Sequence, residues 1–103
     1  MAKLITINEL VTKIYTIQPG DFAEYGRITI RRETGNRWTL NFPGMRNTVM
    51  GTVNEWEGRP DGEVYVFEAY KPCAEDRIRG EVGNPQVAWK TVIKYMRELH
   101  NQH

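Results

Sequence analysis

The first apolar residues of the chain recur with the spacing of one helical face. Four of them stand at positions i, i+3, i+4 and i+7: Ile7, Leu10, Val11 and Ile14. This spacing is typical of an amphipathic helix. Thr6 and Glu9 stand three residues apart at its start, as in a capping box. We therefore predict a helix that begins after Thr6 and ends near Ile17, ahead of the Pro-Gly-Asp turn signal at residues 19–21.

After residue 26 the apolar period changes to two. Five apolar residues alternate with polar ones on the two sides of a turn signal at residues 33–36: Ile28, Ile30, Trp38, Leu40 and Phe42. One apolar face and one polar face is the pattern of a half-buried antiparallel pair. The sequence therefore predicts a hairpin whose arginines fall mostly on the polar face and point to solvent or to a ligand.

The middle of the chain is less clearly patterned. In residues 45–57 four apolar residues have helical spacing, whereas Gly51 and several β-branched residues favour a strand. Of the two alternatives we predict the strand. Residues 63–71 alternate regularly and are partly apolar on both sides, which predicts a strand that is central or covered on both faces.

The last third of the chain begins with a breaker-rich segment and ends in a helix. Residues 72–83 contain one proline, two glycines and five charged residues, and we predict a mobile loop there. Asn84 as N-cap and Pro85 in the first helical position then predict the start of a helix. Its apolar stripe has five members: Ala88, Trp89, Val92, Met96 and Leu99.

Together these elements predict one α+β domain over residues 1–103, because a chain of this length has room for a single core. The expected order is α-β-β-(β)-β-α, with the terminal helices packed on one face of a three- to four-stranded antiparallel sheet. Eight apolar residues are the candidate core: Ile28, Ile30, Trp38, Leu40, Val66, Trp89, Val92 and Met96.

Composition narrows the class of protein. Hydrophobic residues make up 40% of the chain, enough for a folded core, and the formal net charge is +1. This balance excludes a strongly basic nucleic-acid clamp and a strongly acidic DNA mimic. No apolar run approaches the roughly 20 residues of a membrane helix, and no secretory signal is visible. The lone Cys73 fits a reducing compartment, so we expect a cytoplasmic protein without a membrane partner.

The charges, although balanced in total, are separated along the chain. Residues 26–52 hold five arginines and one acid, and residues 53–76 hold seven acids and two basic residues. These segments therefore carry net charges of +4 and −5. Separated charge produces a directional field that can orient a partner.

Two groups of residues are candidates for binding. The basic group joins the hairpin arginines to the cations that face away from the apolar stripe of the last helix: Arg27, Arg31, Arg32, Arg37, Arg46, Lys90, Lys94 and Arg97. Such a group can hold phosphates or an acidic protein surface, provided that the guanidinium groups form a continuous plateau. The acidic group is Glu55, Trp56 and Glu57, in which an exposed tryptophan would anchor a partner. A Trp56 tucked into the core is the alternative, and we favour it.

Few residues of the sequence suggest chemistry beyond binding. His100 and His103 have a helical ligand spacing, but a structural zinc site needs four ligands and the only cysteine is distant. No set of acid, base and nucleophile is evident, so we expect neither an enzyme nor a cofactor or metal. The carboxylate of Glu68, in the middle of a predicted strand, should be solvent-exposed or paired.

The hypothesis favoured by these patterns is a small non-enzymatic binding, modulator or inhibitor protein, of the size common in phage. It would engage a macromolecular partner, with protein favoured, through a charge-polarised surface. The alternative is a nucleic-acid-binding protein that uses the basic hairpin and the last helix. Complementary basic and acidic faces would also allow a homodimer.

Overall fold

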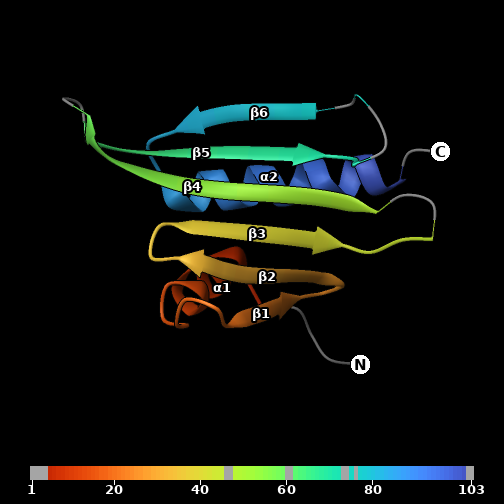
Figure 1. Cartoon of the computed structure of the whole chain (residues 1–103), viewed down its shortest axis with the longest axis horizontal. Coiled ribbons are helices and arrows are strands. Elements are labelled where there is room, and N and C mark those ends of the chain that lie inside the picture. Colours follow the sequence, from red (N-terminus) through yellow and green to blue (C-terminus); the bar gives the residue numbers. More distant parts are fainter. Residues whose placement is uncertain (1–4, 46–47, 60–61, 73–74, 76, 102–103) are drawn as a thin grey trace.

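Over the residues that the structure describes, the chain folds as a helix, six strands and a second helix (Figure 1). The computed structural model describes residues 5–45, 48–59, 62–72, 75 and 77–101. The elements follow one another in this order: α1 (Ile7–Ile14), β1 (Phe22–Tyr25), β2 (Ile28–Thr34), β3 (Arg37–Phe42), β4 (Val49–Arg59), β5 (Gly62–Tyr70), β6 (Arg77–Val82) and α2 (Pro85–Asn101).

Each strand pairs with the next in antiparallel register, so the sheet order is β1-β2-β3-β4-β5-β6. Both helices lie behind the sheet in Figure 1, α2 across β4 and β5 and α1 beside it near β1 and β2. We call this side of the sheet the helix face and the other side the open face. The predicted α+β class is confirmed. The predicted number of strands was too small, because β1 and β6 were not recognised.

The strand β6 corrects the prediction of a loop over residues 72–83. Residues 77–82 pair with β5 without a register shift, and half-buried residues alternate with exposed ones. Gly80 was taken as a breaker, but its missing side chain makes room for Phe67. A Cβ at Gly80 would lie 2.6 Å from Cζ of that ring. The aromatic ring therefore fills the place of the absent side chain and allows glycine within the strand.

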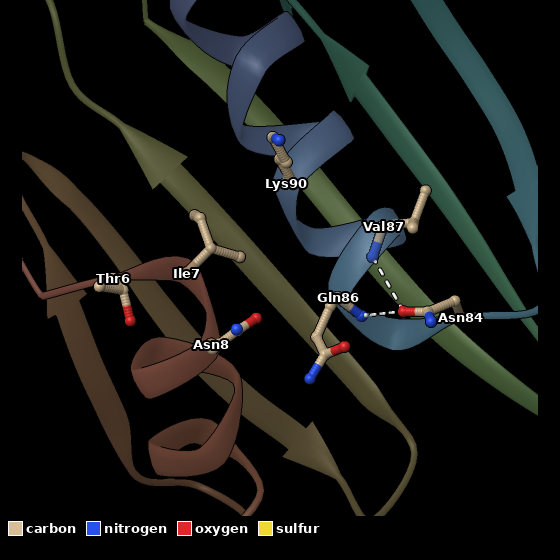
Figure 2. Close-up of a pocket in the computed structure, with 7 residues that line it drawn as sticks. All are labelled: Thr6, Ile7, Asn8, Asn84, Gln86, Val87 and Lys90. Atoms are coloured by element: carbon tan, nitrogen blue, oxygen red, sulfur yellow. Dashed lines mark hydrogen bonds between the residues drawn. The ribbon is translucent and has the colours of Figure 1, made fainter.

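Both helix starts are confirmed. Thr6 Oγ1 accepts a hydrogen bond from the backbone N–H of Glu9 at 3.1 Å, as a capping box requires. Asn84 Oδ1 accepts from the N–H groups of Gln86 and Val87 at 2.9 and 3.2 Å (Figure 2). Helix α1 ends at Ile14, three residues earlier than predicted.

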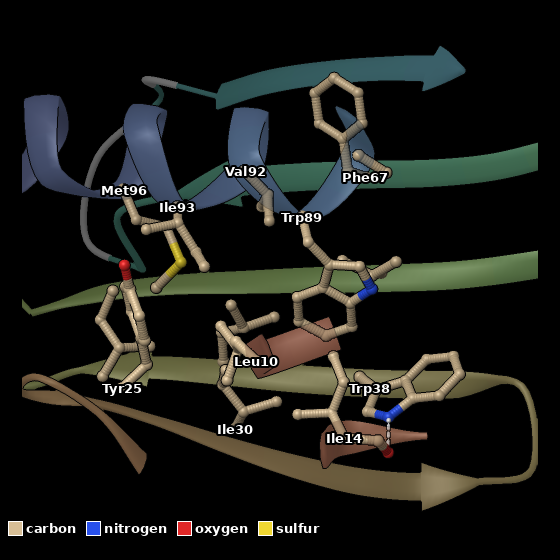
Figure 3. Packing of buried hydrophobic residues seen from close by; sticks show 14 of the residues in the cluster. Leu10, Ile14, Tyr25, Ile30, Trp38, Phe67, Trp89, Val92, Ile93 and Met96 are labelled. Atoms are coloured by element: carbon tan, nitrogen blue, oxygen red, sulfur yellow. Dashed lines mark hydrogen bonds between the residues drawn. The ribbon is translucent and has the colours of Figure 1, made fainter. Parts of the chain in front are cut away.

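The core lies between the helices and the helix face, and two tryptophans meet within it (Figure 3). The Trp38 and Trp89 rings meet edge to face with 5.7 Å between centroids, and Tyr15 packs 4.8 Å from Trp38. All eight candidate core residues are buried, which confirms that prediction. Val66, however, points to the open face, because neighbouring Phe67 points to the helices and successive strand residues alternate. The uncertain segment 45–57 contains strand β4, as predicted.

Candidate functional site

The hairpin arginines do not share one surface. Arg31 and Arg32 are neighbours on β2, so their side chains leave opposite faces of the sheet. Arg31 lies on the open face, exposed, with its Nε 3.9 Å from a carboxylate oxygen of Glu33. Arg37 is exposed on the open face too, next to the buried Trp38. The expectation of a continuous cationic plateau was therefore wrong, because the strand period of two places these arginines on opposite faces of the sheet.

Arg32 is engaged within the fold. Its guanidinium donates to the carbonyl oxygens of Tyr15 and Ile17 at 3.1 and 2.9 Å, and to that of Gly35 at 2.7 Å. It also lies 5.1 Å from the centroid of the Trp38 ring. The side chain thus ties the segment after α1 to the β2–β3 turn. We place Arg32 in the scaffold and leave it out of the candidate site.

Replacing Arg32 by methionine should lower the free energy of unfolding by about 1–2 kcal/mol, because three carbonyl groups lose a charged donor. The neighbouring exposed Arg31 provides the control, since Arg31→Met should cost less than about 0.5 kcal/mol. Urea denaturation of both variants measures the difference. Equal stabilities for the two variants would contradict the scaffold role.

Arg27 lies close to the end of α2. Its guanidinium is 5.6 Å from the Phe42 ring, and its Nη2 donates to the Pro43 carbonyl oxygen at 3.5 Å. Nε2 of His100 lies 3.2 Å from the same oxygen, and the His100 ring stacks on Phe42 with 3.8 Å between centroids. The structure thus brings one hairpin arginine near the last turn of the helix. Arg46 lies outside the described residues.

Lys90, Lys94 and Arg97 form the clearest group of predicted site residues. All three side chains are exposed, and their spacing of i, i+4 and i+7 places them along one face of α2. The Arg97 guanidinium lies 5.4 Å from the centroid of the Tyr25 ring, which orients it toward β1. These cations therefore stand beside the junction of α2 with α1 and β1.

A groove follows this junction, and we call it the α1–α2 groove. It consists of two cavities that share Ile7 and Lys90. The first, of about 300 Å³, separates the start of α1 from the start of α2 (Figure 2) and has seven lining residues: Thr6, Ile7, Asn8, Asn84, Gln86, Val87 and Lys90. The second, of about 370 Å³, continues toward the end of α2 and has eight: Ile7, Tyr25, Lys90, Ile93, Lys94, Arg97, Glu98 and Asn101.

The groove combines apolar walls with basic residues. Ile7 is half-buried and Val87 is 47% exposed, so both offer apolar surface to an occupant. Three cations and one carboxylate, that of Glu98, belong to the lining. Sequence reasoning found these cations from helical spacing. It missed the contribution of Ile7 and Tyr25, because only the folded chain places them against α2.

The acidic group is arranged differently from the prediction. Trp56 is 57% exposed on the open face, so the expectation that it is tucked into the core was wrong. Glu55 and Trp56 line a cavity of about 350 Å³ together with Asn36 and Asn54. The Glu57 side chain lies outside the described part of the structure.

Glu68 is paired, as predicted. One of its carboxylate oxygens lies 3.5 Å from Nη1 of Arg77, so opposite charges lie side by side on the open face.

Comparison with known proteins returns no match: no family model, curated protein or solved structure matches this chain. Within the described residues, no helix has the length and apolar character needed to cross a membrane. The same residues contain no group of three or more histidine, cysteine, aspartate or glutamate side chains placed to hold a metal ion. The geometry of the groove is therefore the feature from which we infer a function.

Proposed function

We propose that this chain is a non-enzymatic binding protein that engages a protein partner by taking an acidic, partly apolar segment into the α1–α2 groove. The observation that carries the proposal is the row of Lys90, Lys94 and Arg97 beside apolar walls. Charge complementarity of this kind steers the encounter and fixes the orientation of the partner. Apolar contact at the walls contributes affinity.

The spacing of the cations indicates the form of the partner segment. Arg97 follows Lys90 by seven positions in the helix, which corresponds to about 10 Å along the axis. An acidic amphipathic helix with carboxylates at i, i+4 and i+7 presents charges at the same intervals. Its apolar side chains would then contact Ile7 and Val87, which are accessible from solvent.

A protein partner fits these observations better than a nucleic acid does. Duplex binding would be strongest if the hairpin arginines joined the α2 cations on one surface. Arg31 and Arg37 instead lie on the face of the sheet opposite α2. Apolar walls also offer little to a phosphate backbone, whereas they suit leucine or valine side chains of a peptide.

The test is a titration of the isotope-labelled protein with a synthetic helical peptide that carries glutamate at i, i+4 and i+7 and leucine on the adjoining face. We expect chemical-shift changes at the amides of Ile7, Lys90, Lys94 and Arg97. Two peptides serve as controls, one with lysine in place of glutamate and one with serine in place of leucine. Both should bind at least about tenfold more weakly, since each lacks one of the two contributions.

Two results would contradict the proposal. One is the absence of any change in the groove amides at millimolar acidic peptide. The other is binding of a short DNA or RNA duplex, with a steep dependence on salt, in place of the peptide. That second result would favour the nucleic-acid alternative.

A further inference from the structure

Strand β6 ends the sheet on one side, and its outer edge carries no neighbouring strand in the described part of the chain. The strand runs for six residues beside β5 without a bulge. Bulges, prolines, inward-pointing charges and charged side chains along the strand are the usual devices that keep such an edge from pairing with another chain. Residues 77–82 contain no bulge and no proline. Their three charged side chains, those of Arg77, Arg79 and Glu81, carry both signs and lie on the open face, so they can attract a second copy as well as repel one.

The inward-facing residues of β6 are apolar or lack a side chain. Ile78 and Val82 are half-buried and pack against the core, and Gly80 between them is covered by the Phe67 ring. The outward-facing residues are charged and exposed, among them Arg79 and Glu81, which have opposite signs. We propose that two copies of the chain associate by antiparallel pairing of β6 with β6 about a twofold axis at Gly80, which joins the two sheets into one.

The register follows from the strand period and the charges. Directly opposed residues of an antiparallel pair lie on the same face, so only every second register is compatible with two buried helix faces. A twofold axis at Arg79 would oppose two arginines, and an axis at Glu81 would oppose two glutamates. An axis at Gly80 opposes Arg79 of each copy to Glu81 of the other. It also places Ile78 of each copy against Val82 of the other.

The other sheet edge is less suited to the same pairing. Strand β1 has four residues, two fewer than β6. Its open-face residues are Phe22 and Glu24, which offer no pair of opposite charges to a second copy. Pairing β1 of one copy with β6 of the next would leave free edges and extend into a filament rather than close as a dimer. The proposal is independent of the α1–α2 groove, which lies on α2 and α1.

The test uses two variants, each with one reversed charge on β6, measured separately and as a mixture of the two proteins. Wild-type protein should approach twice the chain mass of 12.0 kDa in light scattering as its concentration rises from micromolar to submillimolar. Arg79→Glu and Glu81→Arg each create two like-charge cross-strand pairs in the dimer, so each should raise the dissociation constant at least about tenfold. An equimolar mixture restores both attractions and should associate again.

Two further measurements locate the interface. Glu24→Arg on β1 is the matched control and should dimerise as the wild type does. Hydrogen exchange of the edge amides of β6 should slow as the protein concentration rises. The proposal is overturned if the wild type stays monomeric at every concentration. It is equally overturned if a dimer forms that neither reversal weakens, or if the mixed variants fail to associate.

Discussion

Replacing Trp38 by alanine should lower the free energy of unfolding by about 3–5 kcal/mol, the cost of emptying a fully buried aromatic site. Trp38 has 0% exposed surface and contacts both Tyr15 and Trp89. Natural domains have a total stability of about 5–15 kcal/mol, so this one change should remove a large part of it. Urea denaturation followed by circular dichroism measures the loss.

A pair of conservative variants separates packing from hydrogen bonding in this effect. Trp38 Nε1 donates to the carbonyl oxygen of Ile14 at 3.3 Å, which satisfies a group at the end of α1 that has no partner within the helix. Trp89 is equally buried, but its Nε1 has no hydrogen-bond partner in the described structure. Trp38→Phe should therefore destabilise the fold by about 1 kcal/mol more than Trp89→Phe. Equal losses would show that the hydrogen bond contributes nothing.

The sequence was sufficient to predict those elements whose pattern is local. Thr6 and Asn84 determine the helix starts through hydrogen bonds to residues two or three positions away, so the capping residues identify these starts. The β2–β3 hairpin has an apolar–polar alternation and a short turn, with a register shift only beside the turn, between Arg32 and Thr34. The alternation and the turn also are properties of neighbouring residues. In such elements the determining contacts lie within a few positions of one another.

The two missed strands depend on contacts from elsewhere in the chain. β6 contains a glycine that is acceptable only because the Phe67 ring from β5 covers it. β1 has four residues, too few to show a period, and its Ala23 and Tyr25 gain burial from the helices and from β2. Trp56 lies in a segment whose sequence fits either a helix or a strand. Only the fold shows that it belongs to β4 and points to the face of the sheet away from α1 and α2.

In the candidate site, too, some features follow from local sequence and others only from tertiary contacts. The helical spacing of Lys90, Lys94 and Arg97 is visible in the sequence, and all three line the groove. The joining of α1 to that surface is tertiary, so Ile7 was recognised as an apolar helix residue without a place in a site. The separation of Arg31 from Arg32 follows from the strand period alone and was open to prediction. The count of charges per segment did not reveal this separation, because such a count does not say which face of the sheet each side chain lies on.

Reversing two cations of the groove should abolish most of its affinity for an acidic partner. In Lys90→Glu with Lys94→Glu, two attractive contacts become repulsive. Exposed ion pairs contribute roughly 0.2–1 kcal/mol each, so the reversal should cost about 1–3 kcal/mol in binding. This corresponds to an increase of about fivefold to 150-fold in the dissociation constant of the acidic peptide. Fluorescence anisotropy of the labelled peptide measures it.

The matched control changes the net charge of the protein by the same amount at a different place. Arg31→Glu with Arg37→Glu reverses two exposed arginines on the open face, away from α2. If the groove binds the peptide through local contacts, this control should retain nearly the wild-type affinity, because charges beyond a Debye length of about 8 Å are largely screened at physiological salt. If both double variants lose affinity equally, the field of the whole molecule rather than the groove attracts the peptide. A peptide that binds the groove variant unchanged occupies another surface.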